Sequence, residues 1–275
     1  GGAVAFLRGL WLIFTQTTKE LFFSGKTLLF LAGCGIYAAA VALVLSQVGD
    51  QEDNNDLFAF LTLGIYWQGM LPLTAMFFSI SAIRDEIADR TIVFLFDSPI
   101  PRSSIWLGKM FAASVVTILI LLIGYAGAVF LATRVGDDGH YRLAQSTLEA
   151  PWLPIVCGAP AYAAVGTLLA VFFKRSMIAG AIYVIGWEQF IGATPGQAGA
   201  RQLTVIDSVR TMFYHRVEEA GQFRRAMRDW ATGGEDGPAR DAAAAFESLL
   251  WLTGICVALA LILGARKDYD SAPKE

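Results

Sequence analysis

The sequence predicts an all-α, polytopic membrane protein with six transmembrane helices. Of its 275 residues, 55% are hydrophobic and only 16% are charged, and the mean hydropathy is +0.52. Soluble domains carry about a quarter charged residues. The deficit is also local, because five long apolar runs contain no Asp, Glu, Lys or Arg and a sixth contains only Glu188. A soluble fold that buried this many apolar helices would have no polar surface left.

The length of each run places the spans. A bilayer core about 30 Å thick needs roughly 20 apolar residues in a helix. The predicted spans are 27–48, 57–83, 105–133, 152–173, 177–193 and 249–265. The first four clear the required length, whereas the last two have 17 residues each and lie at the short end. No repeat or low-complexity linker divides the chain, so we treat residues 1–275 as one membrane domain.

Residues 1–26 are predicted to form an amphipathic, interfacial N-terminal helix. Its apolar side chains are too few to cross a bilayer before Lys19, and polar side chains interrupt them. Such a helix lies in the plane of the membrane surface. We expect it to turn into the first span near Ser24-Gly25. The polar positions are Arg8, Gln16, Lys19 and Glu20.

The longest connection, 194–248, is predicted to be an outer insertion with a helix of its own. Apolar residues recur at helical spacing over 207–230, and Asp207 or Ser208 can cap this helix. The glycines and proline of 233–238 end it. The helix either lies on the outer leaflet or caps the bundle; the alternative is that it gates the outer side.

The distribution of lysine predicts the orientation. All six lysines fall in connections on one side of the predicted membrane, whereas the first loop on the other side, 49–56, is acidic. Cytoplasmic loops of membrane proteins carry the excess of Lys and Arg. We therefore expect both termini in the cytoplasm.

The residue types that carry catalysis or bind metals are sparse. Cys34, Cys157 and Cys256 lie in three different spans, which argues against a disulfide framework or a cysteine metal site. His140 and His215 are the two histidines, and they are 75 residues apart. We expect no catalytic residues and no metal in this chain, and a net charge of −3 gives no reason to expect a nucleic-acid partner.

Two short sequences imitate part of a nucleotide-binding loop. Gly25-Lys26-Thr27 lacks the earlier glycine that the loop needs, because position 20 is Glu, and a predicted helix rather than a strand precedes it. Gly108-Lys109 is followed by Met110, which has no hydroxyl for Mg²⁺. This chain is therefore not expected to bind ATP or any other cofactor.

The connection between the second and third spans, 84–102, is longer than a simple link requires. Glu86 and Arg90 are four residues apart and can pair on one helix face. Residues 91–96 are apolar, 97–101 contain two prolines that stop a helix, and Ser103 or Ser104 can cap the next one. A short helix with an apolar edge suggests docking to a cytoplasmic partner. The alternative is a helix packed under its own bundle.

This connection resembles the span-two exit of ABC-2 type ABC transporter permeases. The matching pattern has an acid, then Thr, a leucine-like pair, Ser-Pro, Arg and Gly-Lys, and Arg90 stands where the family often has Gly. The six spans, the amphipathic N-terminal helix and the large insertion before the last span also fit this family. The matching positions are Glu86, Arg90-Thr91, Phe94-Leu95, Ser98-Pro99, Arg102 and Gly108-Lys109.

The resemblance implies a permease subunit of an exporter in the cytoplasmic membrane of a prokaryote. Two copies pair, as a homodimer, and each docks a separate ATPase subunit that binds ATP and Mg²⁺. The coupling region would comprise Arg84, Asp85, Glu86, Asp89, Arg90, Thr91, Phe94, Leu95, Ser98 and Pro99.

Other classes of function remain open on the sequence alone. An ABC-type assembly or signalling permease, as in nitrous oxide reductase maturation, would act on a periplasmic partner through 194–248. A secondary transporter would need inverted repeats and broken helices, and a membrane enzyme would need a catalytic cluster.

Two polar residues at membrane depth are candidates for the translocation path or the dimer interface. Glu188 lies roughly 18 Å into the fifth span if that segment is helical, and Gln68 lies near the middle of the second. Buried ionisable groups usually face a cavity or a partner. The alternative is that Glu188 reaches the outer surface beside Trp187 and pairs with an Arg of the long loop. Small residues that allow close helix approach lie at Cys34/Ala38/Ala42, Gly35/Ala39, Gly180 and Gly186.

Overall fold

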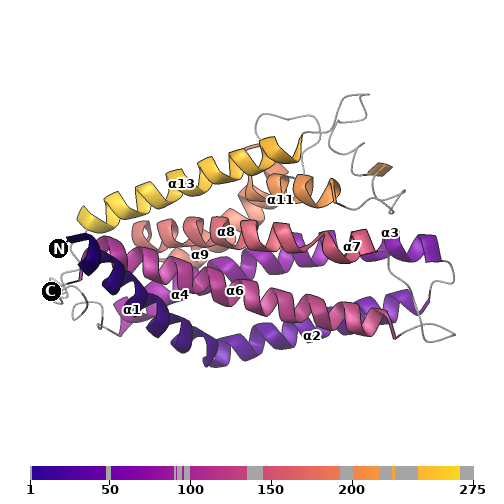
Figure 1. Ribbon diagram of the computed structural model, residues 1–275, viewed down its shortest axis with the longest axis horizontal. Coiled ribbons are helices and arrows are strands. Elements are labelled where there is room, and N and C mark those ends of the chain that lie inside the picture. The colour runs from indigo at the N-terminus through magenta and orange to yellow at the C-terminus, as the bar shows by residue number, and fades with distance from the viewer. Residues whose placement is uncertain are drawn as a thin grey trace.

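The computed structural model of the chain is a bundle of long helices (Figure 1). It describes residues 2–47, 51–89, 91, 95, 100–134, 145–192, 201–216, 225–226 and 241–266, and within these ranges the regular elements are helices. In chain order they are α1 (Gly2–Phe22), α2 (Gly25–Leu45), α3 (Gln51–Leu61), η1 (Thr62–Met70), α4 (Leu71–Ala88), α6 (Arg102–Ala132), α7 (Gln145–Glu149), α8 (Trp152–Phe172), α9 (Ser176–Ile182), η2 (Tyr183–Ile191), α11 (Val205–Tyr214) and α13 (Ala242–Arg266).

Five stretches of the described chain are long and apolar enough to cross a membrane. They are Gly25–Leu45, Asp56–Ala88, Arg102–Ala132, Thr147–Phe172 and Ala242–Ala265. The predicted fifth span, 177–193, corresponds to α9 and η2, which together form a shorter apolar helix, Ser176–Ile191. At the α-helical rise this segment is roughly 24 Å long, which is less than the core of a typical bilayer. Six full spans therefore stay a prediction.

Helix α8 is the centre of the bundle. In the span that contains α8, 67% of the most apolar 18-residue segment is buried. The corresponding shares are 28% for α2 and 22% for α13, which lie at the periphery. Helices α4, α6 and α13 pack around α8, and α1 and α2 pack on α6. Gly166 of α8 lies directly against Ser79 and Met76 of α4, where a β-carbon would clash with the Ser79 side chain. Small residues allow this close approach of helices in a membrane.

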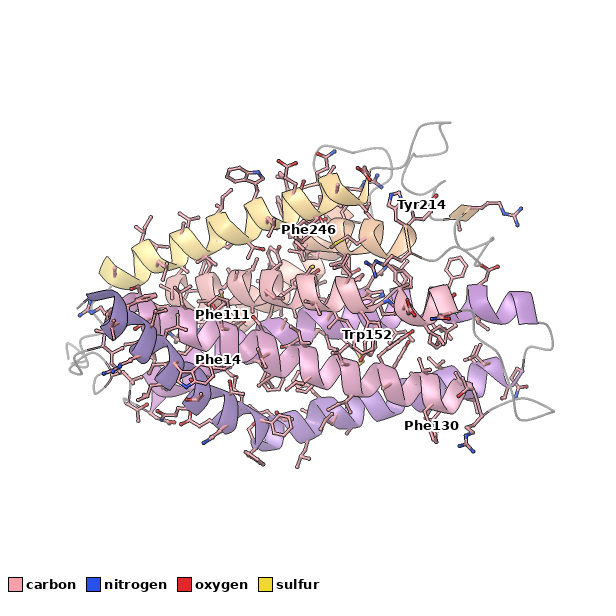
Figure 2. The ribbon with its side chains drawn as sticks, viewed as in Figure 1. Phe14, Phe111, Phe130, Trp152, Tyr214 and Phe246 are labelled. Atoms are coloured by element: carbon pink, nitrogen blue, oxygen red, sulfur yellow. The ribbon has the colours of Figure 1, made fainter. Side chains whose placement is uncertain are left out.

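Apolar side chains also cover the outside of the bundle. Phe111, Phe130 and Trp152, which Figure 2 labels along its length, are 42%, 57% and 53% exposed. An apolar outer surface over long helices is what contact with lipid requires, because lipid tails are as apolar as the side chains themselves. The surface and the lengths of the helices together identify a multi-pass membrane protein.

The N-terminal helix lies oblique to the bundle and bends sharply into α2 (Figure 1). The bend lies at Phe23-Ser24, next to the predicted turn, and the Leu21 carbonyl accepts hydrogen bonds from the hydroxyls of Ser24 (2.7 Å) and Thr27 (2.6 Å). Helix α1 packs closely on α6, since a β-carbon on Gly108 would lie 3.0 Å from Ile13.

Two helix starts differ from the prediction. The helix of the third span begins at Arg102 with Pro101 as its N-cap, so Ser103 and Ser104 lie inside the first turn rather than capping it. Proline favours this boundary because its φ is fixed and it has no N–H to satisfy, and the Ser104 hydroxyl donates back to the Pro101 carbonyl (2.7 Å).

Helix α11 also starts earlier than expected. Its N-cap is Thr204, whose hydroxyl accepts from the Asp207 N–H (3.3 Å), so the predicted caps at Asp207 and Ser208 are wrong. The helix ends at Tyr214, and most of the rest of the predicted 207–230 helix lies outside the described residues. Nine of its ten residues are buried, so α11 caps the bundle instead of lying on a membrane surface.

Candidate functional site

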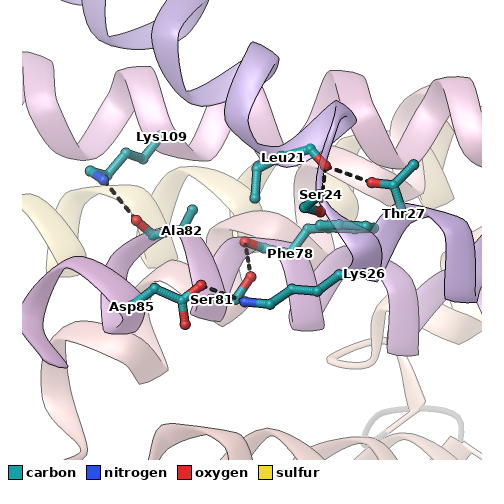
Figure 3. A network of polar contacts seen from close by, with 9 residues as sticks. All are labelled: Leu21, Ser24, Lys26, Thr27, Phe78, Ser81, Ala82, Asp85 and Lys109. Atoms are coloured by element: carbon teal, nitrogen blue, oxygen red, sulfur yellow. Dashed lines mark hydrogen bonds and ion pairs between the residues drawn. The ribbon is translucent and has the colours of Figure 1, made fainter. Parts of the chain in front are cut away.

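A buried lysine joins the helices on either side of the 84–102 connection. The Lys109 ammonium of α6 forms an ion pair with the Glu86 carboxylate of α4 and donates to the Ala82 carbonyl (2.7 Å), as Figure 3 shows for Ala82. The Lys109 side chain is 1% exposed and that of Glu86 is 22% exposed. A cation buried this deeply is tolerated only with such partners, because removing it from water is costly.

Further polar contacts gather at the same end of the bundle, which we call the lysine end because Lys26, Lys109 and Lys174 lie there. Lys26 at the start of α2 pairs with Asp85 at the end of α4 (2.5 Å; Figure 3). The Arg84 guanidinium donates to the Lys174 carbonyl, which follows α8. Asp85 and Lys26 are 53% and 38% exposed, so their pair contributes little stability. Together the contacts fix the relative positions of α2, α4, α6 and the α8–α9 turn.

An acidic cleft lies beside these contacts, between α1 and the end of α4. Its volume is about 470 Å³, and four of its nine lining residues are acids. Glu86 therefore faces both the buried lysine and this cleft. The lining residues are Ile13, Gln16, Thr17, Glu20, Asp85, Glu86, Asp89, Thr91 and Leu95.

The structure brings together part of the predicted coupling region. Asp85, Glu86, Asp89, Thr91 and Leu95 line the cleft, and Arg84 lies beside it on α4. The predicted coupling residues Arg90, Phe94, Ser98 and Pro99, and with them the predicted Glu86–Arg90 pair, lie outside the described residues.

The role of Lys109 was not predicted from the sequence. Gly108-Lys109 was considered only as a motif position, and the lysine was assigned no partner. The signal was nonetheless present, because Lys109 is the only charge in α6 after Arg102 and lies two turns into a 31-residue helix.

The second polar site is centred on Glu188, which is fully buried within the protomer. Its carboxylate accepts hydrogen bonds from the hydroxyls of Tyr183 (2.6 Å) and Tyr162 (3.1 Å). It also accepts from the backbone N–H groups of Val205 (3.1 Å) and Ile206 (2.9 Å), the first two residues of α11. The first N–H groups of a helix have no partner within the helix and carry partial positive charge. Glu188 therefore fixes the start of α11 to η2 and α8, and we call this arrangement the Glu188 latch.

Neighbouring contacts reinforce the latch. Arg210 of α11 donates to the Gly192 carbonyl at the end of η2 (2.9 Å). Burial lowers the pKa of the Arg210 guanidinium, while the nearby Asp207 and Glu188 carboxylates act in the opposite direction. The Gln189 amide donates to the Gln68 carbonyl (2.7 Å), which ties η2 to η1. Both η1 and η2 are π-helical. This conformation is rare in proteins overall, but where it occurs it is often at a functional site.

Glu188 and Gln68 were predicted to face the translocation path or the dimer interface. The Glu188 carboxylate accepts from two backbone amides at the start of α11 and from two tyrosine hydroxyls, where the sequence suggested an arginine partner. Gln68 is partly buried and contacts η2 through its carbonyl. A place on the translocation path or at a subunit interface stays a prediction for both.

The small-residue pairs divide between the inside and the outside of the bundle. Cys34 and Ala38 are buried, and Cys34 lies directly against Gly124 of α6. Gly180 packs against Ile80, whereas Gly35 and Gly186 are exposed with open space around them.

Comparison with known proteins decides the family. Residues 13–204 match the model of the ABC-2 family transporter proteins. The chain belongs to this family. The matched residues include the polar contacts and the acidic cleft of the lysine end. They extend to Thr204, the N-cap of α11, while α13 lies beyond the match. No individual curated protein matches the chain. The chain is thus a multi-pass ABC transporter permease, as its span-two exit indicated.

Proposed function

We propose that this permease is the membrane subunit of an ATP-driven exporter whose ATPase is a separate subunit docked at the lysine end. The proposal rests on the Lys109–Glu86–Ala82 contact. This contact joins α4 to α6 directly beside the 84–102 connection, where the family places the coupling region. A movement imposed on the connection is therefore delivered to two membrane helices at once.

The proposed mechanism assigns ATP and Mg²⁺ to the partner subunit. Closure of two ATPase subunits would displace the coupling regions of two permease copies. The Lys109–Glu86 and Lys26–Asp85 pairs would carry that displacement into α6 and α2. The spans would then change between two arrangements, and the cargo would have access to a path between the copies from one side at a time.

The orientation follows from the same end. Lysine and arginine gather where α4 ends and α6 begins, and the positive-inside rule places such ends in the cytoplasm. We infer that both termini face the cytoplasm of a prokaryotic cell and that α11 lies near the outer surface. The chain itself contributes no ATPase residues in this proposal.

Co-purification tests the proposal. The full-length permease is expressed with a candidate ATPase subunit, and the amount of ATPase retained on the tagged permease is measured. Asp89→Lys reverses an exposed charge in the acidic cleft and should lower retention, whereas Glu149→Lys makes the same change on α7, away from the cleft, and should leave it unchanged. A permease that is stable as a monomer and transports without any ATPase would contradict the proposal.

The Glu188 latch favours a second candidate function. Because α11 is fixed to η2 and α8, motion of the spans would be transmitted to the outer insertion. An ABC-type assembly or signalling permease that acts on a periplasmic protein would use such a connection. Binding of a periplasmic protein to the outer insertion, with no flux of cargo, would favour this candidate over an exporter.

A further inference from the structure

An apolar groove opens on the surface of the bundle between α2, α4 and the α9–η2 segment. Its volume is about 430 Å³, within the range of roughly 300–1,000 Å³ that holds small molecules. Leu73 and Met177 are 50% and 40% exposed, so the groove is open on the side where lipid lies. Its lining residues are Phe30, Leu73, Met76, Phe77, Ile80, Met177, Gly180, Ala181 and Val184.

The groove extends along the membrane axis. On α4 it runs from Leu73 to Ile80 and on the α9–η2 segment from Met177 to Val184, about 10 Å along each helix at the α-helical rise. Gly180 forms part of its floor against Ile80, and Ala181 lines it without filling it. A linear hydrocarbon chain matches this shape and this lining.

Each helix that lines the groove carries a cation about one turn beyond it, at the lysine end. Lys26 precedes Phe30 by one turn on α2, and its ammonium lies 5.8 Å from the centre of the Phe77 ring. Arg84 follows Ile80 by one turn on α4, and its bond to the Lys174 carbonyl holds the α8–α9 turn against α4. Arg175 immediately precedes α9 and is exposed.

The charges at this rim favour an anion. The Lys26 ammonium is paired with the Asp85 carboxylate, while the exposed Lys174 and Arg175 add two further positive charges. Basic sites between transmembrane helices bind the head groups of anionic lipids. The apolar groove matches the acyl chain of such a lipid, and the cationic rim at its end matches the anionic head group.

We propose that the groove binds one acyl chain of an anionic phospholipid, with the head group on Lys26, Lys174 and Arg175. This proposal goes beyond the transport function and rests only on the membrane location of the chain. We favour a lipid over a second copy of the chain as the occupant. A second copy would place an apolar helix against the groove and would leave the cationic rim without a counter-charge.

Native mass spectrometry of the full-length permease tests the proposal. The protein is titrated with dioleoyl phosphatidylglycerol, which is anionic, and with dioleoyl phosphatidylcholine, which has the same acyl chains and no net charge. We expect the first lipid to bind at lower concentration. Arg175→Gln should raise its apparent Kd by about fivefold, the effect of one cation near an anionic surface, whereas Arg134→Gln at the opposite end of α6 should leave it unchanged.

The groove itself is tested by filling it. Ala181→Phe places a ring where the acyl chain would lie and should abolish saturable binding of both lipids. Ala39→Phe makes the same change at an exposed position of α2, nine residues from Phe30 and therefore on the opposite helix face, and should have no effect.

Three results would overturn the proposal. The first is equal binding of the two lipids, the second is an equal loss in the matched controls, and the third is dissociation of a dimer by Ala181→Phe with lipid binding retained. The last result would assign the groove to a second copy of the chain. Because no ATPase is present in these measurements, their failure leaves the proposed transport function standing.

Discussion

Removing the Glu188 carboxylate should weaken the attachment of α11 to the spans. In Glu188→Ala two backbone N–H groups at the start of α11 and two buried tyrosine hydroxyls lose their acceptor. Loss of a helix cap costs about 0.5–2 kcal/mol, and each buried group left without a partner costs about 1–3 kcal/mol. Some of these groups will find water or one another, so we expect a total of about 3–5 kcal/mol.

Thermal unfolding in detergent measures this loss, with tryptophan fluorescence as the signal. At about 2–4 °C per kcal/mol for chains of this size, the midpoint should fall by roughly 6–20 °C. Glu149→Ala removes an exposed carboxylate that accepts a hydrogen bond from Gln145, one turn away on the same short helix, and it should change stability by less than about 0.5 kcal/mol. Hydrogen exchange gives the local readout, because the peptide that contains α11 should lose protection before the rest of the bundle.

Glu188→Gln separates the structural role of this residue from a role in transport. The amide is nearly the same size but offers one acceptor oxygen and places an NH₂ donor against donors, so about 1–3 kcal/mol should be lost. An unchanged midpoint and unchanged protection of α11 in Glu188→Ala would refute the latch. Normal transport and ATPase stimulation in a folded Glu188→Gln protein would show that the ionised carboxylate is not needed on the translocation path.

Three further predictions concern packing and charge, and each is measured as the unfolding midpoint in detergent. Lys109→Met leaves the partly buried Glu86 carboxylate without its cation and the Ala82 carbonyl without its donor, so it should cost about 1–3 kcal/mol, whereas the double variant with Glu86→Leu should recover most of this loss; a double variant as unstable as the single one would contradict the assignment. The exposed Lys26–Asp85 pair should behave differently, and Lys26→Ala or Asp85→Ala should each cost less than about 1 kcal/mol. Gly166→Leu should unfold the permease or force α4 and α8 apart, because Ser79 occupies the space of the new side chain; a variant of normal stability would show that this contact is loose.

The sequence was informative where one physical requirement dominates. Five of the six predicted spans correspond to helices long and apolar enough to cross a membrane. They could be located because a bilayer requires a long run of apolar residues, and such runs can be counted along the chain. The turn into α2 at Ser24 was predicted from the end of one amphipathic pattern and the start of an apolar one. The fifth span was uncertain for the same reason, since its 17 predicted residues correspond to a 16-residue helix in the structure.

The remaining features depend on contacts that no single segment encodes. Lys109 is 23 residues from Glu86, and their pairing follows from how α4 and α6 cross. Glu188 was recognised as a buried acid, but its partners come from α8, η2 and the start of α11. The π-helical bonding of η1 and η2 arises from packing around them and has no signature in residue type. The caps at Pro101 and Thr204 were missed because several adjacent residues were equally suitable.

Chemical cross-linking tests the central claim, that a separate ATPase docks at the lysine end. Thr91→Cys places a thiol at an exposed position that lines the acidic cleft, and Glu149→Cys places one on α7, away from the cleft, both in a chain whose three native cysteines are replaced by Ala. The complex with the ATPase is treated with a short bifunctional cross-linker and analysed by mass. We predict that Thr91→Cys is joined to the ATPase and Glu149→Cys is not. Cross-linking at Glu149→Cys, or at neither position in a complex that hydrolyses ATP, would contradict the claim.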